Sequence, residues 1–170
     1  LIPALDKIGA DFESGRLFLP QLILSAEAAG GCFDVIKSKM KENGTVAQSK
    51  GVIVIATVKG DVHDIGKNIV KTVLENYGFT VIDLGKDVPP ERVLEVQREH
   101  NARLVGLSAL MTTTLGAMEE TISLLKGNNA NCKIMVGGAV LTEEYAKKIN
   151  ADFYAKDAKA PADIAKEIFK

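Results

Sequence analysis

Beyond residue 51, short apolar runs alternate with amphipathic segments, and this alternation constrains the fold more than any other feature. The runs are VIVIATV, FTVIDL, RLVGLS, CKIMV and DFYA, and the segments between them, such as PPERVLEVQREH, have helical periodicity. Strand-like runs separated by helices predict a parallel sheet that is covered on both faces. In about 120 residues, this pattern predicts a flavodoxin-like (Rossmann-like) α/β fold with strand order 2-1-3-4-5.

This strand order brings two loops to one edge of the sheet. Right-handed crossovers force the order to reverse between the first and third strands, and open α/β sheets bind ligands beyond the carboxyl ends of strands at that point. The loops there are KGDVHDIG (59–66) and SALMTTTLG (108–116). His63 therefore lies where a ligand is expected.

The first 42 residues have a different pattern. Apolar residues at helical spacing run from Leu5 to Phe12 and, after the turn GRLFLPQ, from Leu22 to Ile36. The following segment, NGTVAQSKG, is polar and rich in turn formers. We expect a partial helical cap over residues 1–42, a linker over 43–51 and an α/β domain over 52–170.

Composition limits the partners and the compartment. The formal net charge of -1 and the pI near 6.2 provide no basic surface for nucleic acid. No apolar stretch approaches the ~20 residues that cross a bilayer, and the amphipathic start, which carries acidic residues, is not a signal peptide. We expect a cytoplasmic protein that binds neither nucleic acid nor membrane. Cys32 and Cys132 stand alone in apolar segments and are expected to be unreactive, buried thiols.

Several ordinary explanations compete for the loop histidine. It could be a solvated residue, with Asp64 near a helix N-cap. A catalytic triad is not favoured because the chain has no GxSxG elbow, and a phosphate loop would carry glycines where this loop is acidic. A response-regulator receiver would use an acidic pair such as Asp61 and Asp64 with Lys156 after the fifth strand, but Ser108 stands where its phospho-acceptor aspartate would be.

A metal carried by a cofactor explains the loop better. The chain has two histidines, and His100 lies near a predicted helix end, so one imidazole is on offer. One ligand suffices if the metal arrives in a macrocycle, because the protein then supplies a single axial bond and a shaped slot. Asp61, two residues before His63, is placed to accept the other ring N–H and orient the imidazole.

Three motifs carry a family resemblance. GDVHDIGKN, SALMTTT and VGGAVLT resemble the DxHxxG, SxL and GG signature of the cobalamin-binding modules of corrinoid methyltransferases. The segment GRLFLPQLILSAEAA resembles the capping bundle that precedes this module in cobalamin-dependent methionine synthase. That bundle has four helices, and this chain begins too late for the first two, so we expect a piece of a longer protein.

The resemblance implies a role for each matching residue. His63 corresponds to the lower axial ligand of cobalt and Asp61 to its hydrogen-bonded partner. The hydroxyl that ends this catalytic relay falls on Thr114, although Thr112 and Thr113 are its neighbours.

Other positions correspond to cofactor contacts. Ser108 and Leu110 match residues beside the displaced benzimidazole tail, and Gly137 and Gly138 match the pair that leaves room for the nucleotide; an ordinary strand-to-helix turn with positive φ would also explain the two glycines. Phe18 and Leu22 match the cover of the upper, methyl-bearing face, or are plain helix-packing residues. The remaining implied contacts are Asp64, Ile65, Gly66, Thr112 and Ala158.

The resemblance implies a methyl carrier. Its cofactor would be cobalamin (methylcobalamin), whose cobalt passes a methyl group from a donor such as methyltetrahydrofolate to homocysteine. Partner methyltransferase domains or subunits would bind the substrates, so the isolated chain is not expected to be active. LFLPQ and IDLGKDVPP favour methionine synthase; the alternative is a corrinoid protein of a methylamine, methanol or aryl methyl ether system. A cobalamin-dependent regulator would carry a basic DNA-binding segment, and a mutase would not have this cap.

Overall fold

The computed structural model describes residues 1–42 and 49–170, without the side chains of residues 2, 6, 13, 37 and 40–42. Its parallel sheet has the predicted order, β2-β1-β3-β4-β5. The strands are β1 (Val52–Thr57), β2 (Thr80–Asp83), β3 (Leu104–Ser108), β4 (Lys133–Gly137) and β5 (Phe153–Ala155). The helices are α1 (Ile2–Glu13), α2 (Leu19–Glu42), α3 (Ile65–Asn76), α4 (Pro90–Glu99), α5 (Leu115–Gly127), α6 (Glu143–Lys148) and α7 (Ala160–Ile168), with a 3-10 turn η1 (Thr112–Thr114).

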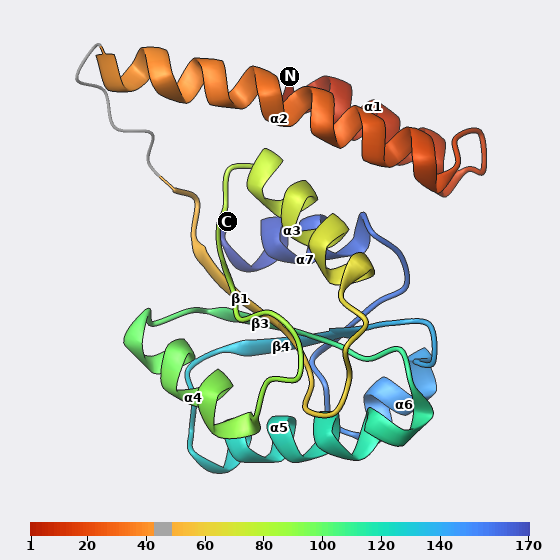
Figure 1. Ribbon diagram of the computed structural model, residues 1–170, viewed down its shortest axis with the longest axis vertical. Helices are drawn as coiled ribbons and strands as arrows, with labels where there is room; N and C mark the ends of the chain where they lie inside the picture. The colour runs from red at the N-terminus through yellow and green to blue at the C-terminus, as the bar shows by residue number, and fades with distance from the viewer. Residues whose placement is uncertain (43–48) are drawn as a thin grey trace.

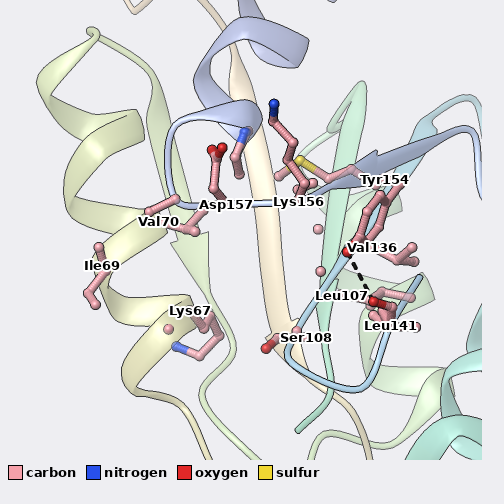
Figure 2. Close-up of a pocket in the computed structure, with 18 of the residues that line it drawn as sticks. Lys67, Ile69, Val70, Leu107, Ser108, Val136, Leu141, Tyr154, Lys156 and Asp157 are labelled. Carbon is pink, nitrogen blue, oxygen red and sulfur yellow. Dashed lines mark hydrogen bonds between the residues drawn. The ribbon is translucent and has the colours of Figure 1, made fainter. Parts of the chain in front are cut away.

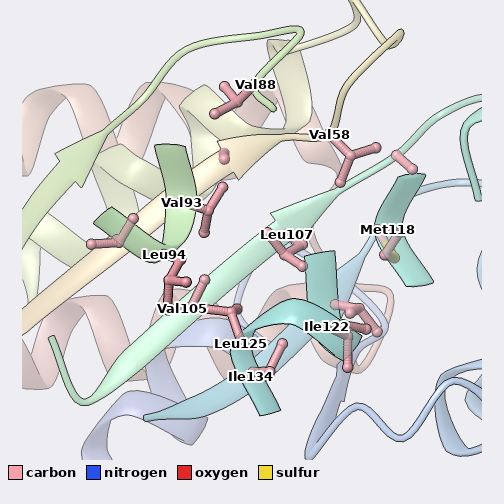
Figure 3. Close-up of a cluster of buried hydrophobic side chains, with 14 of the residues drawn as sticks. Val58, Val88, Val93, Leu94, Val105, Leu107, Met118, Ile122, Leu125 and Ile134 are labelled. Atoms are coloured by element: carbon pink, nitrogen blue, oxygen red, sulfur yellow. The ribbon is translucent and has the colours of Figure 1, made fainter. Parts of the chain in front are cut away.

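Both faces of the sheet are buried, which explains why its strands are continuous apolar runs. On one face, Val54 and Val105 pack with Val93 of α4 and Ile122 of α5 (Figure 3). On the other face, Ile53 and Leu104 pack with residues of α3 and α7. Figure 1 shows the helices arranged in these two layers. The sheet edge that carries the candidate site is therefore held from both sides.

The helical cap forms a further layer outside α3 and α7 (Figure 1). Leu5 of α1 and the small residues Ala26 and Ala29 of α2 are buried in the same apolar cluster as Leu74 of α3. The Asn76 side chain donates a hydrogen bond of 2.6 Å to the carbonyl of Ala26. Small side chains on α2 thus let α3 approach closely enough for a buried polar contact between the two layers.

The outer face of α2 differs from the sequence-based expectation. Leu24 and Val35 are 65% and 64% exposed, and Cys32, predicted to be buried, is exposed. Among the described residues, Leu19–Ile36 is long and apolar enough to span a membrane by length and composition. In this structure, 17% of that window is buried. Length and composition of this kind also occur in core helices and signal sequences, so they are weak support for a span.

The second cysteine and the predicted linker can also be compared with the structure. Cys132 is half-buried, and burial, followed by the charge of Asp152, raises the pKa of its thiol to about 11, in line with an unreactive thiol. Most of the predicted linker, residues 43–48, lies outside the described residues.

Candidate functional site

The loop between β1 and α3 places His63 at the carboxyl edge of the sheet. The loop turns at Gly60, whose φ of +83° favours glycine, and the N–H of Asp61 donates to the carbonyl of Val58 over 3.0 Å. Asp64 then occupies the N-cap position of α3. The backbone therefore leaves β1, turns once and enters α3 with His63 at the turn.

Asp61 is the centre of this site and is fully buried, with an exposed fraction of 0%. Its Oδ1 lies 2.8 Å from Nδ1 of His63 and accepts the His63 backbone N–H at 3.0 Å. Its Oδ2 accepts the N–H groups of Leu110 and Met111 at 2.7 and 3.2 Å. The Thr114 hydroxyl also donates to Oδ2, over 3.0 Å. One carboxylate thus joins the two loops that follow β1 and β3.

The electrostatics of Asp61 determine the state of His63. Burial by itself raises the pKa of Asp61, but the hydrogen bonds from His63, Leu110 and Thr114 together hold it well below its usual range. The carboxylate is therefore ionised and can only accept hydrogen bonds. A neutral His63 must then carry its hydrogen on Nδ1, which leaves the lone pair of Nε2 free to bind a metal.

His63 stands among exposed apolar side chains. Its own side chain is 45% exposed, and Val62, Ile65 and Leu110 around it are 57%, 77% and 42% exposed. Three apolar side chains at a loop edge leave a patch that a flat apolar ligand would cover. Thr112 and Thr113 are exposed, whereas Thr114 is buried against Asp61, so the structure selects Thr114 among the three hydroxyls.

A cavity of about 440 Å³ lies between α3 and the sheet. Figure 2 shows Lys67, Ile69 and Val70 of α3 on one side of it and Ser108, Leu141 and Tyr154 on the other. Gly66, Gly137, Gly138 and Ala158, which were predicted as cofactor contacts, also line it. The cavity and the His63 loop share α3 and the end of β3, so they form one continuous site.

A buried ion pair fixes the first turn of α3 beside this cavity. Lys67 Nζ lies 2.5 Å from Oδ1 of Asp83, at the end of β2, and also donates to Asn68 over 2.7 Å. Burial raises the pKa of Asp83, whereas the hydrogen bonds from Lys67 and Gly85 lower it, and the net result is a lowered pKa. No motif in the sequence indicated this pair.

The glycine pair has a different explanation from the one the motif suggested. Gly138 adopts a φ of +136°, and an added Cβ there would collide with the Ala109 carbonyl oxygen. A Cβ at Gly137 would lie 3.3 Å from the carbonyl oxygen of Ala155. Backbone packing and the positive φ therefore explain the glycine at 138, as the turn interpretation anticipates. A need for space in the cavity stays a second, compatible reason.

The cap residues separate into two groups. Leu22 is 6% exposed and lies beside Leu5, Val73 and Tyr77, which matches the packing interpretation; its role as a cofactor cover stays a prediction. Phe18, in the turn between α1 and α2, is 68% exposed. The cap residues that line the cavity are Phe12 and Leu19, which the motif did not indicate.

Comparison with known proteins decides the family. Models described as "B12 binding domain" match residues 51–162 and 1–37. The chain is a member of the B12-binding domain family. It is a corrinoid-binding module, and the cofactor of this module is cobalamin with its cobalt.

Curated relatives of this B12-binding module are named corrinoid proteins. Dimethylamine corrinoid protein 1 of Methanosarcina acetivorans is 46% identical over 170 residues, which cover 99% of this chain and 79% of the relative. Trimethylamine corrinoid protein 1 of Methanosarcina mazei is 42% identical, over 91% of this chain and 72% of the relative. These relatives favour the corrinoid-protein alternative over methionine synthase, so the preference drawn from LFLPQ and IDLGKDVPP is not supported.

Solved structures agree with this assignment. A cobalamin-binding protein from Desulfitobacterium hafniense matches with a TM-score of 0.83 and 34% identity, over 96% of this chain and 77% of that chain. The methanol:cobalamin methyltransferase complex of Methanosarcina barkeri matches with a TM-score of 0.83 and 32% identity, over 97% and 63%. A receiver domain of a Mycobacterium tuberculosis response regulator matches at 13% identity, which shows a shared fold and no more.

The residues of this chain fit cobalamin on structural grounds. The cavity volume lies in the range of roughly 300–1,000 Å³ that holds small ligands. The donor set also suits a metal that a cofactor carries: the half-exposed His63 imidazole has its Nδ1 held by the Asp61 carboxylate, which leaves Nε2 as the one ligand to offer. No cluster of three or more His, Cys, Asp or Glu side chains that could hold a metal ion occurs in the described part of the chain.

Proposed function

We propose that this chain is the methyl-carrying corrinoid protein of a methylamine methyltransferase system, with dimethylamine as the methyl donor. Bound cobalamin supplies a cobalt that accepts and releases the methyl group. Support comes from the 46% identity to a dimethylamine corrinoid protein over nearly the whole chain. The observation that carries the carrier role is the exposed His63 imidazole held by the buried Asp61 carboxylate.

The chain's own residues orient and shield the carrier. Asp61 fixes the ring of His63 so that Nε2 points away from the carboxylate, and Thr114 with the Leu110 N–H keeps that carboxylate in place. Because the His63 ring is already fixed before the cofactor binds, little conformational entropy is lost when it coordinates the metal. Val62, Ile65 and Leu110 exclude water around the imidazole once they are covered.

Among the described residues, we assign none to binding of the amine. We infer that a methyltransferase subunit binds dimethylamine and docks on the loaded module, so that the two proteins share the reaction. The methanol:cobalamin methyltransferase complex of Methanosarcina barkeri contains a chain of this fold, which supports a partnership of the same kind. The cap then has to allow the partner access to the cofactor.

The test is a reconstituted transfer assay. The cobalamin-loaded protein should acquire a methyl group from dimethylamine when a purified dimethylamine methyltransferase is added, and more slowly or not at all with the trimethylamine or methanol enzymes. Ser108→Leu should reduce cobalamin retention by about tenfold or more, because filling a preformed site costs ~1–3 kcal/mol. Thr113→Leu, at an exposed position, is the matched control. Methyl transfer only from methyltetrahydrofolate would contradict the proposal and restore the methionine synthase interpretation.

A further inference from the structure

The loop after β2 lies directly beside the His63 loop. Because β2 neighbours β1 in the sheet, the segment from Leu84 to Val88 pairs with the end of β1. The Thr57 N–H donates to the carbonyl of Gly85 over 2.9 Å, and the Val88 N–H donates to the carbonyl of Thr57 over 3.1 Å. The loop that follows β2 therefore supports the start of the loop that carries the axial histidine.

Asp87 makes the two contacts that reach the centre of that loop. Its Oδ1 accepts the N–H of Gly60 over 2.7 Å, and its own N–H donates to the carbonyl oxygen of Asp61 over 3.0 Å. These contacts hold the backbone before and after the Gly60–Asp61 peptide bond. The Asp61 carboxylate, by contrast, is held by the β3 loop and by His63. Asp61 is thus fixed through its side chain by one loop and through its backbone by another.

The backbone of Asp87 adopts an unfavourable conformation to make these contacts. Its φ is +56°, in the left-handed region, which costs a residue other than glycine roughly 1–2 kcal/mol. Aspartate and asparagine tolerate this region better than other side chains. Such a conformation persists only where surrounding contacts stabilise it, and residues of this kind cluster at functional sites.

We propose that Asp87 is a positioning residue for the cobalt ligand. It holds Gly60 and Asp61 so that the carboxylate of Asp61 meets Nδ1 of His63 and Nε2 faces the cofactor. The inference rests on the proposed function, because it requires His63 to bind cobalt. It adds to that function a residue that acts on the imidazole through the backbone of Gly60 and Asp61.

Two substitutions separate the hydrogen-bond acceptor from the backbone conformation. Asp87→Gly removes the acceptor but adopts positive φ freely, whereas Asp87→Asn keeps an acceptor oxygen and tolerates positive φ. Lys86→Ala, at the exposed neighbouring position, is the matched control. With the cobalamin-loaded protein, the ratio of His63-coordinated to uncoordinated cobalt(II) is measured from its electron paramagnetic resonance spectrum. Glycine should lower this ratio by roughly tenfold, the lower end of the range for groups that orient a metal ligand, and asparagine should restore it.

A second measurement uses the protein without cofactor. Hydrogen exchange of the Gly60 amide should accelerate in Asp87→Gly and stay slow in Asp87→Asn and Lys86→Ala. If Asp87→Gly unfolds more readily but its folded fraction coordinates cobalt as the wild type does, Asp87 is structural only and the inference fails. If asparagine behaves like glycine, the acceptor role is also overturned. If the wild type binds cobalamin without coordination by a histidine nitrogen, the His63 assignment fails first, and this outcome is distinguishable from the other two.

Discussion

The His63 loop and the helical cap hold their positions by different means. In the loop, a fully buried carboxylate accepts hydrogen bonds from His63, Leu110, Met111 and Thr114. In the cap, apolar packing of residues such as Leu5 and Ala26 against α3, with a hydrogen bond from Asn76 to the Ala26 carbonyl, attaches α2 to α3, and Phe18 is largely exposed. The loop is therefore held by a buried polar network, whereas the cap is held mainly by apolar packing.

This difference matters if His63 is the cobalt ligand, as we propose: the loop would then hold that ligand in place while the cap allows partners to reach the cofactor. Local opening free energies are lowest where few apolar contacts hold a segment. A polar network, in contrast, is stable only when every member is satisfied. Substitutions should consequently be costly in the loop and mild in the cap.

The largest effect is expected from Asp61→Ala. It leaves the Leu110 N–H, the Met111 N–H and the Thr114 hydroxyl without their acceptor, and each buried unpaired group costs ~1–3 kcal/mol. We expect the free energy of unfolding to fall by about 3–5 kcal/mol, measured by urea denaturation. A loss below about 1 kcal/mol would show that the loop is not held by its polar network.

Acid should weaken the loop specifically. The pKa of Asp61 is lowered in the folded protein, so its contribution to stability is complete above the unfolded pKa of about 3.9 and is lost as pH falls through the folded pKa. Between pH 5 and 2.5, the stability advantage of the wild type over Asp61→Asn should shrink, with a limiting slope of about 1.4 kcal/mol per pH unit. A constant difference across this range would mean that Asp61 does not titrate as an anchored carboxylate. The pKa of Asp83 is also lowered, but Asp83 is present in both proteins, so its contribution cancels in the difference in stability.

Asn76→Ala tests the attachment of the cap. Removing the donor to the Ala26 carbonyl should cost about 1–2 kcal/mol and speed hydrogen exchange in α2 more than in the sheet. Thr72→Ala, one turn earlier on α3, should change stability by less than about 0.5 kcal/mol. Equal acceleration of exchange in α2 and β3 would show that the cap and the sheet open as one unit.

The smallest stability change is expected from Phe18→Ala. An exposed side chain in a turn contributes within about 0.5 kcal/mol. If Phe18 covers the methyl-bearing face of the cofactor, however, photolysis of the methylated protein should accelerate. Leu24→Ala, equally exposed on α2, should leave the photolysis rate unchanged. The same rate in both variants would assign the cover to other residues, with Phe12 and Leu19 as the next to test.

Local patterns predicted the sheet and the position of the His63 loop. Continuous apolar runs separated by helices determine a parallel sheet, and the strand order then places KGDVHDIG beside SALMTTTLG. The sequence alone could not choose among three adjacent threonines, because that choice depends on the 3-10 turn that buries Thr114. It also missed Asp87 and Lys67, whose partners lie 27 and 16 residues away. Asp87 could have been suspected, because the predicted order puts β2 beside β1 and so brings a polar residue of the loop after β2 close to the His63 loop.

The most direct test of the central claim is the identity of the axial ligand. The protein is prepared with nitrogen-15 in histidine, loaded with cobalamin and reduced to cobalt(II), and its electron paramagnetic resonance spectrum is compared with that of unlabelled protein. If His63 binds cobalt, each triplet in the nitrogen superhyperfine pattern becomes a doublet on labelling, and His63→Gly loses that pattern while His100→Gly, at the exposed end of α4, retains it. A triplet that persists in the labelled protein would mean that the cofactor's own base remains on cobalt and would contradict the account.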